Sequence, residues 1–150
     1  MRITFKGDYA LKAILDLSFT FGNPQTIDSI AKRQDIPVKF LEQILLTLKK
    51  GGFVVSSRGR IGGYALSRPP QKITLGEIIS YIDGPVEPIS CTLKKGGTKC
   101  SYSAKCAFYD IFCEIGDYIS SVVNMITFED LKERQLRKET NKGKYLDYNI

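Results

Sequence analysis

The sequence predicts a mainly helical protein with one small β-hairpin, in which a compact N-terminal unit precedes a long helix. Apolar residues recur at three- and four-residue steps in the first third of the chain and again over about residues 104–126. Between these regions, two short apolar segments flank a glycine-rich turn at residues 57–63. The chain has 150 residues, of which 43% are hydrophobic and 25% charged, so we expect a globular protein with a real core.

Three short helices are expected first. The apolar periodicity predicts one over about residues 7–21. Thr26 is a suitable N-cap for the second, and the third is expected over residues 38–50, where two glycines stop it. The inward face of this third helix should bury Phe40, Leu41, Ile44, Leu45 and Leu48.

The hairpin follows, with strands expected at residues 53–56 and 64–66. A capping-box pattern formed by Thr74 and Glu77 then predicts a fourth helix over about residues 75–83. A loop with little periodicity leads to the long helix, and Thr127 looks like the cap of one more short helix. We therefore divide the chain into a first domain (1–84), a cysteine-containing loop (85–106), the long and short helices (107–131) and a polar tail (132–150).

Three short helices followed by a glycine-tipped hairpin is the winged helix-turn-helix arrangement. Residues 38–72 hold seven basic residues and one acid, so the whole formal net charge of +6 lies in this segment. Such a field favours a polyanion such as DNA, although a solvated basic face would have the same charge. The predicted DNA contacts are Lys39, Glu42 and Gln43 in the third helix, Lys49 and Lys50 at its end, and Arg58, Gly59 and Arg60 at the hairpin tip.

Composition excludes several classes of chemistry. The chain has no histidine, which removes imidazole-based catalytic triads and zinc sites, and no base–nucleophile constellation is visible, so we do not expect an enzyme. Charged residues interrupt the N-terminal apolar stretch, which fits neither a signal peptide nor a membrane span. We therefore expect a cytoplasmic protein that does not insert into membranes, with its thiols reduced.

All four cysteines lie in one window of the chain. Cys91, Cys100 and Cys106 lie on or beside the predicted loop, whereas Cys113 falls on the long helix between apolar neighbours and is expected to be a packed structural residue. The spacing matches neither a zinc ribbon nor a ferredoxin. Metal binding, redox chemistry and thiols with no metal all remain open on this spacing alone.

Longer motifs add a resemblance. They are residues 1–4 (MRIT), 9–11 (YAL), 40–45 (FLEQIL), 48–54 (LKKGGFV), 57–59 with 62–64 (SRG and GGY) and 73–79 (ITLGEII). In these motifs, spread over about residues 1–131, the sequence resembles the Rrf2 family of bacterial transcriptional regulators. The resemblance implies a homodimeric winged-helix repressor or activator that reads palindromic double-stranded DNA and dimerises through the long helix.

The resemblance also implies an iron–sulfur cluster, with [4Fe–4S] favoured over [2Fe–2S], held by Cys91, Cys100 and Cys106. The eight residues between the first two cysteines make a longer loop than many members have. One branch places a histidine ligand where this chain has Tyr109. The nitric-oxide-sensing branch can use an aspartate from the partner subunit, and Asp8 stands at that position, so we favour Asp8 over Cys113 as the fourth ligand.

The resemblance implies that nitric oxide, redox or iron–sulfur status controls DNA affinity through this cluster. Two other interpretations stay open. In the first, the same fold lacks iron–sulfur, and a zinc site, a thiol redox switch or a small molecule sets the affinity. In the second, the chain is a small electron carrier or a protein-interaction module on a winged-helix scaffold.

Overall fold

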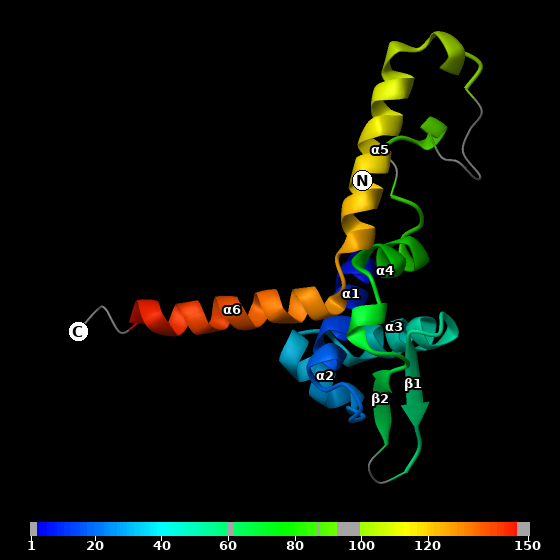
Figure 1. Ribbon diagram of the computed structural model, residues 1–150. Coiled ribbons are helices and arrows are strands. Elements are labelled where there is room, and N and C mark those ends of the chain that lie inside the picture. The colour runs from blue at the N-terminus through cyan, green and yellow to red at the C-terminus, as the bar shows by residue number, and fades with distance from the viewer. Residues whose placement is uncertain (1–2, 60–61, 87, 93–99, 147–150) are drawn as a thin grey trace.

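The computed structural model describes residues 3–59, 62–86, 88–92 and 100–146. Figure 1 shows a compact body from which three elements project: the hairpin at one end, helix α5 (Ala107–Met125) as a long arm, and helix α6 (Phe128–Leu146) at a steep angle to that arm. The mainly helical class with one hairpin is confirmed.

The first three helices form most of the body. They are α1 (Phe5–Phe19), α2 (Ile27–Gln34) and α3 (Val38–Lys50). The hydroxyl of Thr4 accepts a hydrogen bond from the Gly7 amide at 3.1 Å, so α1 begins two residues earlier than its apolar periodicity indicates. Thr26 caps α2 as expected, and the bounds expected for α3 are confirmed.

The hairpin consists of β1 (Val54–Ser57) and β2 (Gly63–Leu66), paired antiparallel so that Val54 lies opposite Leu66. The 3₁₀ turn η1 (Pro70–Lys72) leads to α4 (Leu75–Ile82), where both hydrogen bonds of the capping box between Thr74 and Glu77 are present. The sequence signals for these elements are local, and the structure confirms them to within one residue.

The main core lies where α1, α3, the hairpin and the start of α6 meet. Leu41, Ile44, Leu45 and Leu48 of α3 are buried in it, as expected. Phe40 is not: 64% of it is exposed, which contradicts the inward position predicted for it. Successive residues point 100° apart on a helix, and the four buried positions already fill the face turned toward α1 and α2.

Two backbone hydrogen bonds join the segment between α5 and α6 to the start of α4 and the segment that precedes it. Leu75 donates from its amide to the carbonyl of Ile126 at 2.8 Å, and Phe128 donates to the carbonyl of Ile73 at 2.9 Å. Phe128 is completely buried in the main core. The junction between α5 and α6 is therefore held against the start of α4, which fixes the direction in which α5 leaves the body.

Helix α6 is much longer than the short helix predicted after Thr127. It continues to Leu146, through most of the segment assigned above to a polar tail (132–150). Its residues are strong helix formers, and Glu133 pairs with Arg137 one turn later at 3.0 Å. Propensity and ion pairing hold the helix although its apolar stripe is weak. No helix within the described ranges has the length and apolar character needed to cross a membrane.

Candidate DNA interface and cysteine site

The first turns of α3 present polar side chains to solvent. Lys39, Glu42 and Gln43 are all exposed, as expected from the buried positions of their neighbours. Gln43 can donate and accept with the N6 and N7 edge of adenine, and Glu42 can accept from the N4 amino group of cytosine. The exposed face of α3 therefore carries the groups that a recognition helix needs.

The C-terminal end of α3 is tied to the hairpin. Lys49 and Lys50 are both exposed, and the Lys49 ammonium donates to the Ser56 hydroxyl at 2.6 Å. This contact holds Lys49 between the helix and β1, where its charge faces outward. Both lysines are available to phosphate groups that pass the end of the helix.

The tip of the hairpin projects beyond the rest of the body (Figure 1). Arg58 and Gly59 are exposed, and Gly59 adopts a φ of 118°, a left-handed conformation that favours glycine. Arg60, which we also expected at this tip, lies outside the described residues. The described part of the turn places an arginine where it can reach a neighbouring groove of a duplex.

Arg68, a basic residue of the 38–72 segment, does not belong to the candidate DNA-binding surface of α3 and the hairpin tip. Arg68 forms an ion pair with Glu77 at 2.9 Å and donates to the carbonyl of Lys72, and its guanidinium lies 5.2 Å from the centre of the Phe53 ring. Arg68 therefore ties the hairpin to α4, and its charge is balanced within the fold.

A buried carboxylate positions the helix-turn-helix. Asp16 of α1 is 4% exposed and accepts hydrogen bonds from Arg33 at 2.9 and 2.7 Å and from Gln34 at 3.0 Å. The hydrogen bond from Arg33 to Asp16 raises the pKa of Arg33 above its ordinary value. The network fixes α2 against α1. No local sequence signal predicts this network, because Asp16 and Arg33 lie far apart in the chain.

The same network reaches the hairpin through Gln25. Arg33 donates to the side chain of Gln25, whose backbone exchanges two hydrogen bonds of 2.8 Å with Tyr64 of β2. Neighbouring Gly63 lies so close that a Cβ atom there would meet the Gln25 carbonyl at 2.4 Å. Any larger residue at position 63 would push the Gln25 segment away from the hairpin, so Gly63 is needed for this close approach.

The cysteines are distributed along the distal part of the α5 arm. Cys91 lies in the 3₁₀ turn η2 (Ser90–Thr92), which packs against α5, and Cys106 is the N-cap of α5, just after η3 (Ser103–Lys105). Cys100 is exposed, and the other three thiols are half-buried. Across the described ranges, no three cysteine, aspartate or glutamate side chains lie close enough to share a metal ion.

Cys113 differs from the packed residue that we expected. It is half-buried, and its side chain forms a hydrogen bond with the Tyr109 hydroxyl one helical turn earlier. The charge of Cys113 and this hydrogen bond raise the pKa of Tyr109, and the charge of Cys91 adds to the effect. Cys91 and Cys113 therefore both influence the pKa of Tyr109, the residue that stands where one branch of the family has a histidine ligand.

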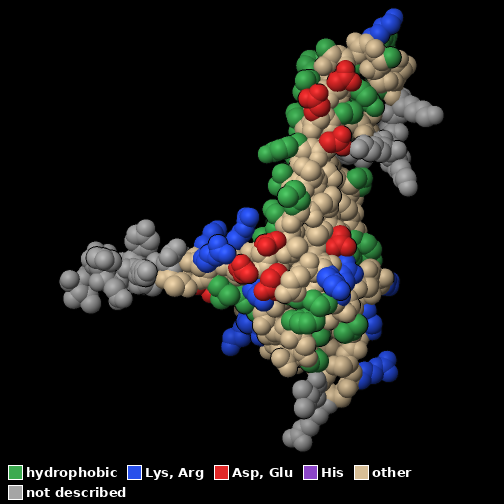
Figure 2. Space-filling view, viewed as in Figure 1, with side chains coloured by type: hydrophobic (Ala, Val, Ile, Leu, Met, Phe, Trp, Pro, Cys, Tyr) green, Lys and Arg blue, Asp and Glu red, His purple; other side chains and the backbone are tan. Residues whose placement is uncertain are grey.

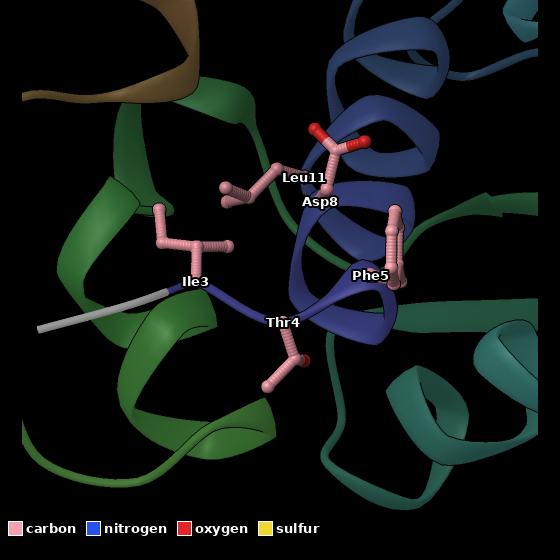
Figure 3. A pocket seen from close by; sticks show the side chains of 5 residues that line it. All are labelled: Ile3, Thr4, Phe5, Asp8 and Leu11. Atoms are coloured by element: carbon pink, nitrogen blue, oxygen red, sulfur yellow. The ribbon is translucent and has the colours of Figure 1, made fainter.

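Asp8 lies far along the chain from these thiols, on the first turn of α1. Its carboxylate is about half exposed and forms an ion pair with Lys12 at 2.8 Å. Figure 3 shows Asp8 projecting at the edge of a cavity of about 650 Å³ that Ile3, Thr4, Phe5 and Leu11 complete. The carboxylate is open to a ligand that approaches this cavity from outside.

The arm carries a continuous apolar stripe. Hydrophobic side chains follow α5 along its length in Figure 2. Six exposed residues alternate at steps of three and four, the spacing that keeps them on one face of a helix: Phe108, Ile111, Ile115, Tyr118, Val122 and Met125. Such a large apolar surface is typical of an interaction site.

Comparison with known proteins agrees with this geometry. Residues 3–134 match the Rrf2 family, which is described as an iron-dependent transcriptional regulator. The chain belongs to the Rrf2 family. An Rrf2-like HTH-type transcriptional regulator of Rhodobacter capsulatus is 38% identical over 136 residues, which cover 86% of this chain and 91% of that protein. The HTH-type transcriptional regulator IscR of Escherichia coli is 35% identical, covering 90% and 82%.

Two solved structures of this Rrf2 protein's relatives are also similar. The global cysteine regulator CymR of B. subtilis has a TM-score of 0.75 and 30% identity, covering 89% of this chain and 98% of that one. IscR of T. potens has a TM-score of 0.72 and 30% identity, covering 90% and 88%. The winged-helix fold and a role as a transcriptional regulator, rather than an enzyme, follow from this membership.

Proposed function

We propose that this Rrf2 protein binds palindromic double-stranded DNA as a homodimer. The observation that carries the proposal is the exposed polar surface of α3 at Lys39, Glu42 and Gln43, beside a projecting hairpin with Arg58 and Gly59 at its tip. Glu42 and Gln43 would read base edges in the major groove. Lys39, Lys49 and Lys50 would contact phosphates, and the hairpin arginines Arg58 and Arg60 would contact the adjacent minor groove.

The apolar stripe of α5 supports the homodimer. Its six residues lie on one face, while other residues of the helix, such as Ile119 and Val123, pack toward α4, and the helix also contacts η2. An identical stripe on a second copy would match it in length and spacing, as in other helix pairs. Two bodies related by a two-fold axis then present two copies of α3, which favours a palindromic site with half-sites about one DNA turn apart.

Selection from a random duplex library, followed by binding titrations at several salt concentrations, tests this function. We expect enrichment of a palindrome, two protein chains per duplex, and an affinity that falls steeply with salt because phosphate contacts release counterions. Retention of random duplexes without enrichment would contradict sequence-specific reading. An affinity independent of salt would instead favour a protein-interaction module.

We further propose that an iron–sulfur cluster controls DNA affinity in response to nitric oxide, redox or iron–sulfur status. The support is chemical: thiolates are the ligands that such clusters prefer, and Cys91, Cys100 and Cys106 are present without competing histidine. Among the described residues these three thiols do not lie close enough together to share one metal ion, so the proposal rests on the chemistry of the donor set. The open carboxylate of the partner subunit's Asp8 is the proposed fourth ligand.

Anaerobic reconstitution tests the cluster without relying on DNA. Iron and acid-labile sulfide are measured per chain, and the number of irons per chain, together with electron paramagnetic resonance of the reduced protein, distinguishes [4Fe–4S] from [2Fe–2S]. We expect Cys91→Ser, Cys100→Ser and Cys106→Ser to lose the iron, Asp8→Ala to release it faster, and Cys113→Ser to retain it. Loss of iron in Cys113→Ser with no change in Asp8→Ala would overturn the assignment of the fourth ligand.

A thiol-based switch is the second candidate. It is favoured by the similarity to CymR, for which an oxidised form from Staphylococcus aureus is 27% identical with a TM-score of 0.71. In that case the purified protein is colourless and holds no sulfide, and a mild oxidant changes its DNA affinity. One bound zinc per chain would point instead to a zinc site.

A further inference from the structure

An aromatic groove lies directly beside the DNA-reading face of α3. It has a volume of about 580 Å³ and is lined by Phe5, Lys6, Tyr9, Phe40, Gln43 and Ile44, at the contact between the start of α1 and the first half of α3. Phe5 is 80% exposed and Phe40 64% exposed. Exposing two phenylalanines at one place is unfavourable in water, so the groove is a candidate contact surface.

The position of Phe40 decides what this surface contacts. Phe40 lies one helical turn before Gln43, and residues three apart on a helix are neighbours on its surface. Gln43 belongs to the polar face proposed to read bases, and both side chains line the same groove. Anything that Gln43 contacts in a major groove therefore also lies within reach of Phe40.

The charges around the groove favour DNA over a protein partner. Lys6 lines it, and Lys39 is exposed next to Phe40, while Glu42 is the one acid of the 38–72 segment. An A·T pair offers two kinds of group in the major groove: the N6 and N7 edge of adenine, which suits glutamine, and the thymine 5-methyl group, which suits an apolar side chain. Gln43 and Phe40 match these two groups.

We propose that Phe40 contacts the 5-methyl group of a thymine in the same base pair that Gln43 reads or in the next one, with Phe5 closing the outer side of the methyl pocket. The inference rests on the proposed DNA binding and adds a specificity determinant to it. It also gives a role to the side chain whose exposure the sequence did not predict.

Uracil substitution tests the contact, because uracil differs from thymine only by the missing methyl group. In the selected duplex, each thymine is replaced in turn by deoxyuridine, and dissociation constants are measured for the wild-type protein. We expect one thymine per half-site at which the affinity falls about fourfold, the loss expected when one buried methyl group is removed.

The same duplexes are then measured with variants. Phe40→Ala, which removes the contact from both chains, should bind the thymine duplex about as weakly as the wild type binds a duplex with uracil at that position of both half-sites, and should not distinguish the two bases. Phe40→Leu, which keeps an apolar side chain, should retain part of the discrimination. Phe21→Ala is the matched control: Phe21 is also an exposed phenylalanine, but it follows the other end of α1 from the groove.

The outcomes separate this inference from the proposed function. If a palindrome is selected but no uracil substitution changes the affinity, or if Phe40→Ala still distinguishes thymine from uracil, the methyl contact is wrong and DNA binding stands. If no DNA sequence is selected, both the proposed sequence-specific DNA binding and the methyl contact are wrong. Phe40 is mostly exposed, and equal thermal unfolding of the variants and the wild type confirms that the fold is intact.

Discussion

At the scale of single residues, two arginines with the same charge have different roles. Arg58 is exposed at the tip of the hairpin, whereas Arg68 is held by Glu77, by the Lys72 carbonyl and by the Phe53 ring. A bound polyanion can use the charge of Arg58 without breaking any described contact. The charge of Arg68 is already balanced, so its removal should act on the fold instead.

We therefore predict that Arg58→Ala lowers DNA affinity about fivefold or more and reduces the salt-dependence slope by about 2, one for each chain of the proposed dimer, with no change in thermal unfolding. Arg68→Ala is the matched control. It should lower thermal stability, because the hairpin loses its link to α4, and leave the slope nearly unchanged. Fluorescence anisotropy across a salt series measures both effects. Equal slopes for Arg58→Ala and the wild type would remove Arg58 from the interface.

Arg33 links α2 to the buried carboxylate of Asp16 on α1. Its removal leaves the buried carboxylate of Asp16 with Gln34 as its remaining described partner. We predict that Arg33→Ala lowers the free energy of unfolding by about 2–3 kcal/mol, below the range for fully buried pairs because the Arg33 side chain is 42% exposed and reached by water.

Urea denaturation measures this loss, and Arg33→Lys provides the comparison. Lysine keeps the positive charge but cannot make the paired hydrogen bonds of a guanidinium, so its stability should fall between those of Arg33→Ala and the wild type. If Arg33→Ala is as stable as the wild type, the network does not hold α2 in place.

At the scale of elements, α6 begins with a capping arrangement that responds to pH. The Thr127 hydroxyl donates to the Asp130 carboxylate at 2.7 Å, and the Thr127 amide donates to it at 2.8 Å. The hydrogen bonds from the hydroxyl and the amide lower the pKa of Asp130 from its ordinary value of 3.8. An acid with a lowered pKa stabilises the fold in its charged form.

Asp130 should stabilise the protein more at neutral pH than at acid pH. The contribution of Asp130 is complete above its unfolded pKa of 3.8 and is lost as the pH falls through the lower pKa of the folded state. We predict that the difference in free energy of unfolding between the wild type and Asp130→Ala is largest above about pH 5 and shrinks toward pH 3. Urea denaturation over this range measures it. A difference that is constant or grows at low pH would contradict the assignment.

Local signals are enough for most elements of the body. The capping box at Thr74 and the glycines after α3 lie within a few residues of the helix ends that they set, so the sequence predicts those ends well. Helix α6 was underestimated because its apolar stripe is weak, although its propensity and its Glu133–Arg137 pair favour a helix. Hydrophobic periodicity alone does not detect a helix of this kind.

At the scale of the whole molecule, the orientation of α5 governs how two bodies can face one DNA duplex. The backbone ladder between residues 73–75 and 126–128 fixes the base of the arm, and the apolar stripe lies along its free face. Dimerisation through this stripe would set the distance between the two copies of α3. DNA reading and dimerisation are then geometrically coupled although their residues lie on different elements.

We predict that Ile115→Glu, which places a charge in the middle of the stripe, converts the dimer into a monomer. Size-exclusion chromatography with light scattering measures the mass, and DNA titrations should show binding to a single half-site with affinity for the palindrome reduced by at least tenfold, because two contacts no longer act together. Ile115→Leu keeps the apolar surface and should remain dimeric. A dimeric Ile115→Glu would place the interface elsewhere.

Some features of the candidate site follow from local spacing along a helix, and others depend on contacts between distant parts of the chain. The exposure of Lys39, Glu42 and Gln43 follows from the helical period once the buried positions of α3 are known. Phe40 was predicted to face inward because it is apolar, but Leu41, Ile44, Leu45 and Leu48 already fill the buried face of the helix. The proximity of Cys113 to Tyr109 follows from their four-residue spacing on α5, whereas the influence of Cys91 on Tyr109 depends on η2 packing against that helix.

By itself, the sequence determined the order and nature of the elements of the body, the concentration of positive charge in residues 38–72, the identity of the available metal ligands and the family resemblance. These depend on residue type and on spacing along the chain, where local propensity and periodicity act. The tertiary structure alone decided which side chains remain in water: the Phe5–Phe40 groove, the buried Asp16 network and the separation of the thiols. Each depends on contacts between residues far apart in the chain, where packing overrides local preference.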